Sequence, residues 1–158
     1  MMCLAAIHPP MGKNPPQSAD AMFVNNATAE AFALHLRNLI VFLYPERFRL
    51  EADDISAHHF IDSKSPYEDW LRHRPPLPSI LERAKIRADK ELAHLTTARI
   101  AGTPPAKHWE PCALLRELKR VLASFAERAD SNRVGVRTRT AIAALAEGVA
   151  RRCPDGAG

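Results

Sequence analysis

The chain has 158 residues, of which 46% are hydrophobic, and this is enough for one domain with a core of its own. Its net charge is +4. No run approaches the roughly 18 apolar residues of a membrane span, and residues 1–16 lack the apolar centre of a signal peptide, so we expect a cytoplasmic protein without membrane contact. Three widely spaced cysteines predict neither a zinc site nor a disulfide framework, and no cofactor is indicated.

The N-terminal part of the chain is expected to form a tail followed by a long helix. Residues 1–17 are polar and proline-containing without a period, which predicts a disordered tail. Residues 18–24 are typical of a short helix that Asn25–Asn26 interrupts. Residues 27–44 then follow the helical rule, and Pro45 ends this helix. Its apolar stripe consists of Phe32, Leu36, Leu39 and Leu43.

Two polar residues of this helix, His35 and Asn38, lie one turn apart among apolar neighbours. One interpretation makes them hydrogen-bonded polar residues at the edge of the core. The other makes them supports of a functional site on a neighbouring helix.

Residues 46–74 are the least regular part of the sequence. Asp53 is placed to cap a short helix over residues 54–60, which carries His58 and His59. The acidic residues nearby invite a metal-site interpretation, but no spacing of the HExxH kind is present, so no metal is predicted. The aromatic residues of this connection are expected to attach it to the core, where it would form one wall of a cleft.

The sequence is organised around a helix predicted over residues 79–101. Ser79 and Glu82 have the spacing of a capping box, while Gly102 and Pro104–Pro105 mark the end. Arg87 and His94 are seven residues apart, about two turns, so their side chains share a direction. The face expected to be buried consists of Leu81, Ala84, Ala88, Leu92 and Leu95.

A further helix is predicted over residues 111–130, with Pro111 in its first turn and a buried stripe that includes Leu118, Val121 and Phe125. Residues 131–158 are expected to be a basic linker and a short amphipathic helix, 140–152, ending in a frayed tail. Arg133, Arg137 and Arg139 of the linker are candidates for binding nucleic acid or an acidic partner; the alternative is a solvated basic end.

No alternating strand pattern, glycine-rich phosphate loop or serine-hydrolase motif appears. The predicted fold class is therefore all-α, an up-down helical bundle with flexible N- and C-terminal tails, and its main domain spans residues 18–130.

The Arg-x6-His pattern of Arg87 and His94, on the second of two long antiparallel helices, resembles the signature of the HEPN superfamily of small all-α domains. The amino-acid sequence from Ala88 to Thr96, and that around His35, is also similar to segments of small uncharacterised bacterial helical proteins. In the family an Asn, Asp or His usually follows the arginine directly; here Asp89 comes one residue later.

The resemblance implies a homodimer in which the arginines and histidines converge to cleave RNA without a metal, as in toxin–antitoxin or antiviral systems. His94 would then transfer the proton and Arg87 would hold the phosphate, because histidine titrates near neutrality and arginine donates bidentately. The supporting residues would be His35, Asn38, Asp89 and Lys90. Other members of the superfamily are non-catalytic binding or regulatory modules, and an unrelated helical protein is the third alternative.

Overall fold

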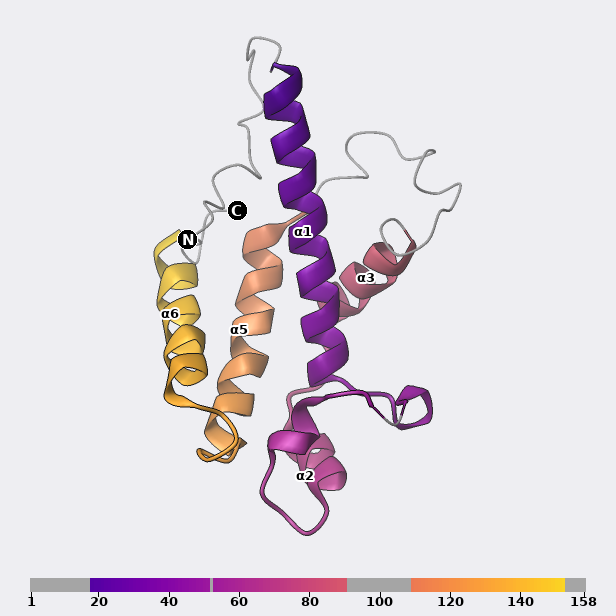
Figure 1. Cartoon of the computed structure of the whole chain (residues 1–158), viewed down its shortest axis with the longest axis vertical. Helices are drawn as coiled ribbons and strands as arrows, with labels where there is room; N and C mark the ends of the chain where they lie inside the picture. The colour runs from indigo at the N-terminus through magenta and orange to yellow at the C-terminus, as the bar shows by residue number, and fades with distance from the viewer. Residues whose placement is uncertain (1–17, 52, 91–108, 153–158) are drawn as a thin grey trace.

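The structure is a computed structural model that describes residues 18–51, 53–90 and 109–152, and within these ranges it is an all-α bundle. Three helices run side by side: α1 (Ala19–Leu43), α5 (Pro111–Arg128) and α6 (Val136–Arg152) (Figure 1). α1 and α5 run in the same direction and α6 returns antiparallel. α3 (Ser79–Ala88) packs against α1 and α5, and α2 (Pro66–His73) lies near the C-terminal end of α1. None of the described helices is long and apolar enough to cross a membrane.

The first helix is longer than the sequence pattern predicts. α1 begins at Ala19 and continues through Asn25–Asn26, so the expected break between a short and a long helix is wrong. Asparagine is only a moderately poor helix former. In a helix of 25 residues, the low helix propensity of two asparagines does not outweigh the continuous series of backbone hydrogen bonds. The helix ends at Leu43, because Pro45 follows and the indole nitrogen of Trp70 donates to the Leu43 carbonyl at 2.7 Å.

The core is formed where α1, α3 and α5 meet. The predicted stripe residues Leu36, Leu43 and Leu81 are buried, as are Ala88, Leu118, Val121 and Phe125, whereas Phe32 and Leu39 are only half-buried. Leu92 and Leu95 lie outside the described residues. The core also contains Ile40 and Tyr44 of α1, Ile61 and Trp70 from the segment between α1 and α3, and Leu114 and Leu122 of α5.

The start of α3 differs from the expected capping box. The helix begins at Ser79, but Pro78 occupies the N-cap position and no side chain caps the helix. After Ala88 the backbone widens into a π-type turn at Asp89–Lys90, and residues 91–101 lie outside the described part of the chain.

The irregular connection between α1 and α2 is attached to the C-terminal end of α5. It contains two short 3₁₀ turns, η2 (Arg47–Arg49) and η3 (Ala57–Phe60), in place of the helix expected over 54–60. Ile61 forms an isolated antiparallel bridge with Ala129, and the amide of Asp130 donates to the Phe60 carbonyl at 2.8 Å. This connection therefore holds α2, with the buried Trp70, against the bundle.

Two further expectations about the second half of the chain are corrected. α6 begins at Val136, inside the stretch expected to be an irregular linker, and its Ile142 and Leu145 pack against the core. Cys112, in the first turn of α5, is disulfide-bonded, whereas the sequence predicted no disulfide framework.

Candidate functional site

The structure separates the predicted site residues of α3 onto two faces. Residues two apart on a helix point about 200° away from each other, so Arg87 and Asp89 face in nearly opposite directions. Asp89 faces α1, and Arg87 faces the segment before α5. His94, the expected partner of Arg87, lies outside the described residues.

Asp89 belongs to an ion-pair network that joins α1 to α3. Its carboxylate accepts from Arg37 Nε at 2.5 Å and from Lys85 Nζ at 3.4 Å. Burial by itself would raise the pKa of Asp89, but the hydrogen bond and charge of Arg37, helped by Lys85, hold this pKa below its usual range. Arg37 also donates to Asn38 at 3.3 Å. The network fixes α3 on α1, which is a structural role.

The other predicted supports lie at the surface. His35 and Asn38 are both exposed on α1, and Lys90 is exposed just after the end of α3. Asn38 joins the network of Asp89 through Arg37.

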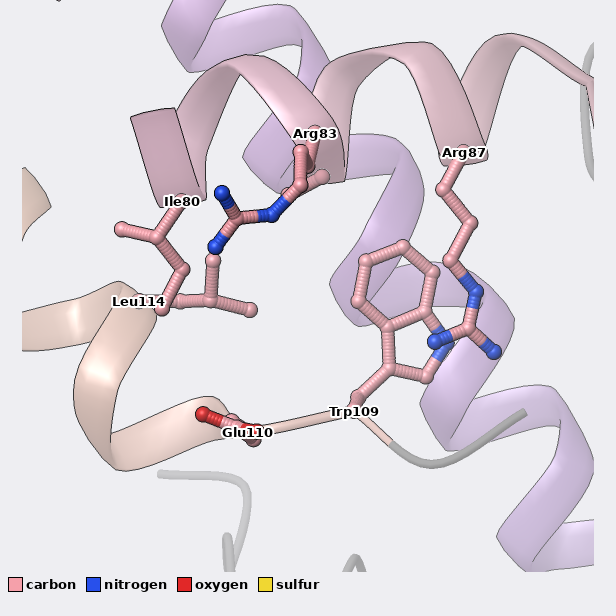
Figure 2. Close-up of a pocket in the computed structure, with 7 residues that line it drawn as sticks. Ile80, Arg83, Arg87, Trp109, Glu110 and Leu114 are labelled. Atoms are coloured by element: carbon pink, nitrogen blue, oxygen red, sulfur yellow. The ribbon is translucent and has the colours of Figure 1, made fainter. Parts of the chain in front are cut away.

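Arg87 faces a tryptophan and a pocket. The Cζ atom of its guanidinium lies 4.3 Å from the centre of the Trp109 ring, a distance typical of a cation–π contact. Trp109 stands just before α5, and its ring is half-buried. The two side chains line a pocket of about 270 Å³ between α3 and the start of α5, together with Ile80, Arg83, Ala84, Glu110 and Leu114 (Figure 2).

The pocket places a second arginine beside the first. Arg83 precedes Arg87 by one helical turn, so both side chains leave α3 on the same side, and in the view of Figure 2 the indole of Trp109 lies between their guanidinium groups. Arg83 is exposed and has no ion-pair partner within the described part of the chain. Among the described residues that line the pocket, Glu110 is the one acidic side chain, and it comes from the opposite wall. Two positive groups and an aromatic ring therefore converge on a space large enough for a small anionic ligand.

Arg133, Arg137 and Arg139, which were expected to bind nucleic acid, lie near the end of α5 that is far from the pocket. The 18 residues of α5, with a rise of 1.5 Å each, separate the two ends by roughly 27 Å. Arg137 is exposed there. Arg133 donates to the His59 carbonyl at 2.9 Å and pairs with Asp130. Arg139 donates to the carbonyls of Ala126, Ala129 and Val134, so its guanidinium closes the C-terminal end of α5.

The two adjacent histidines act as a local cap. The backbone amide of Ser56 donates to His59 Nδ1 at 3.0 Å, and Ser56 Oγ lies 2.8 Å from His58 Nδ1. Burial, and then the neighbouring His59, hold the pKa of His58 below its usual value. Within the described ranges no group of three or more His, Cys, Asp or Glu could hold a metal ion.

Sequence reasoning found Arg87 but missed the rest of its pocket. The sequence analysis assigned neither Arg83 nor Trp109 to the site. The i, i+4 arginine pair on α3 was a usable signal, but the ring that completes the pocket follows more than 20 residues later, and no periodic pattern connects it to α3.

Comparisons with protein families, with curated proteins and with solved structures find no significant match to this chain. The resemblance to the HEPN superfamily therefore stays a prediction that rests on Arg87, on His94 and on the all-α fold.

Proposed function

We propose that this protein is a small helical binding module for single-stranded RNA, and that the pocket of Arg83, Arg87 and Trp109 is where the RNA binds. Single-stranded nucleic acids are bound by positively charged grooves that contain aromatic rings, since arginine attracts the phosphate and the ring stacks on a base. A space of about 270 Å³ suits one nucleotide unit and not a duplex.

The observation that carries this proposal is the position of Arg87 over the ring of Trp109, 4.3 Å from its centre, with Arg83 one turn away. An arginine plane held against an indole is ordered before any ligand arrives, which lowers the entropy cost of binding. Arginine suits phosphate because its planar fork is always charged and donates two parallel hydrogen bonds.

A metal-independent endoribonuclease of the HEPN-like type is the second candidate, because Arg87, the residue that the resemblance assigns to phosphate binding, lines the pocket. This proposal adds His94 as the proton-transfer group and a homodimer that brings two copies of the motif together. It places the protein in the cytoplasm, where an antitoxin or another regulatory protein would control it.

One binding experiment tests both candidates. A labelled single-stranded RNA is titrated with the protein in EDTA, fluorescence anisotropy reports binding, and a denaturing gel of the same samples reports cleavage. We expect Arg87→Gln and Arg83→Gln each to weaken binding about tenfold, the value of one charge-assisted hydrogen-bonded contact. The matched control is Arg72→Gln, which removes the same charge from an exposed position on α2 and should bind as the wild type does.

The outcomes separate the two candidates. Binding without cleavage supports the module, whereas cleavage in EDTA that disappears in His94→Ala supports the ribonuclease. Absence of binding by the wild-type protein, or equal weakening by all three arginine variants, contradicts the proposed site.

A further inference from the structure

The pocket carries opposite charges on its two walls. Arg83 and Arg87 come from α3, while Glu110 comes from the segment before α5, next to Trp109 (Figure 2). Glu110 occupies the N-cap position of α5, but its side chain makes no capping hydrogen bond. It is exposed, and within the described ranges its carboxylate has no ion-pair partner. The carboxylate is therefore available to a ligand in the pocket.

A carboxylate opposite two arginines restricts which ligand fits. It repels a second phosphate, so a ligand that is anionic at both ends is disfavoured on the Glu110 side. An ionised carboxylate only accepts hydrogen bonds, and its two oxygens accept from two neighbouring donors at once. The ligand should hence carry a phosphate at one end and a pair of hydrogen-bond donors at the other.

Among the RNA bases, guanine carries such a pair of adjacent hydrogen-bond donors. Its N1–H and its N2 amino group are adjacent donors, whereas uracil offers a single N–H, and adenine and cytosine each offer one amino group beside an acceptor nitrogen. We infer that the pocket selects guanine: the base stacks against the Trp109–Arg87 pair, Glu110 accepts from N1–H and N2–H, and Arg83 binds a flanking phosphate. This inference rests on the proposed function, because it assigns the base that the same pocket recognises.

The test compares short oligonucleotides that differ at one central base. Four labelled RNAs, UUUUU, UUGUU, UUAUU and UUCUU, are titrated by anisotropy, and a fifth, with inosine at the centre, lacks only the N2 amino group. We expect UUGUU to bind about tenfold more tightly than UUUUU, the discrimination of one bidentate side-chain–base contact. Inosine should fall between the two, because one of its two donors is missing.

Glu110→Gln gives the corresponding protein test. The amide keeps one acceptor and adds a donor, so the ratio of the affinities for UUGUU and UUUUU should fall close to one. The affinity for UUUUU should be at least as high as in the wild-type protein. The matched control is Glu127→Gln, which removes an exposed carboxylate near the far end of α5 and should retain the full preference.

Failure of this inference is distinguishable from failure of the proposed function. Equal affinity for all five RNAs, or a Glu110→Gln variant that weakens every RNA by the same factor, overturns the selection of guanine and leaves RNA binding standing. If no RNA binds to the wild-type protein, both proposals are overturned.

Discussion

Arg139 offers the sharpest test of how the basic C-terminal segment is used. Its guanidinium donates to the carbonyls of Ala126, at 2.6 Å, of Val134, at 3.2 Å, and of Ala129. These groups close the end of α5, where a helix leaves carbonyls without backbone partners. Arg139→Gln removes the charge and most of these bonds, so the variant should lose stability even though no apolar contact is deleted.

The size of the effect follows from the number and exposure of these bonds. Hydrogen bonds to a charged group contribute about 1.5–3 kcal/mol, and because these are only partly buried, water replaces some of them. We therefore expect a loss of about 1.5–2 kcal/mol in the free energy of unfolding. For a chain of this length it corresponds to a melting temperature lower by about 3–8 °C.

The assay is thermal and urea unfolding followed by far-UV circular dichroism. The matched control is Arg137→Gln, which removes the same charge two residues away from an exposed side chain and should melt with the wild-type protein. If Arg139→Gln melts with Arg137→Gln and instead loses RNA affinity, the structural role is refuted and Arg139 contacts the ligand.

Three further predictions concern binding, pH and the core. If Arg83 and Arg87 each contact one phosphate, a plot of the logarithm of the RNA affinity against the logarithm of the salt concentration should have a slope of about −1.4. The affinity would then fall roughly sevenfold between about 50 and 200 mM salt. An affinity that does not change with salt would exclude phosphate contacts. Because folding lowers the pKa of His58 below its ordinary value of 6.5, the unfolded chain takes up the proton first as the pH falls. The urea midpoint of the wild-type protein should therefore fall as the pH drops below about 6.5, and it should fall less in His58→Gln. An equal fall in the two proteins would contradict the lowered pKa of His58. Trp70→Phe leaves the Leu43 carbonyl without its indole donor and should cost about 2–3 kcal/mol in unfolding free energy, and an unchanged urea midpoint would show that this bond contributes nothing.

The sequence predicted the helices best where one apolar stripe repeats. The stripe through Leu118, Val121 and Phe125 placed α5 to within two residues of its C-terminal end, and Pro111 marked its start. Boundaries that depend on a single residue type were less reliable: Asn25–Asn26 did not break α1, and Ser79 did not cap α3. Such local preferences amount to less than about 1 kcal/mol each, and tertiary packing outweighs them.

The candidate site was harder to predict because its parts come from distant segments. The i, i+4 spacing brings Arg83 and Arg87 to one side of a helix, and this much is readable from the sequence. The placement of Trp109 and Glu110 against them depends on how α5 packs on α3, which no local pattern encodes. Likewise, the spacing of Arg133, Arg137 and Arg139 predicted a binding patch, whereas in the structure Arg133 and Arg139 bond to backbone carbonyls and Arg137 is exposed.

The most direct test of RNA binding at the pocket is the tryptophan fluorescence of the protein during titration with single-stranded RNA. The chain has two tryptophans: Trp70 is 1% exposed and bonded to a carbonyl, whereas Trp109 is half-buried in the pocket wall. We predict a saturable change in emission in the wild-type protein, produced by a base stacking near Trp109, that persists in Trp70→Phe and is absent in Trp109→Phe. If emission does not change while RNA binds by anisotropy, or if the change persists in Trp109→Phe, the RNA binds elsewhere and the proposed site is wrong.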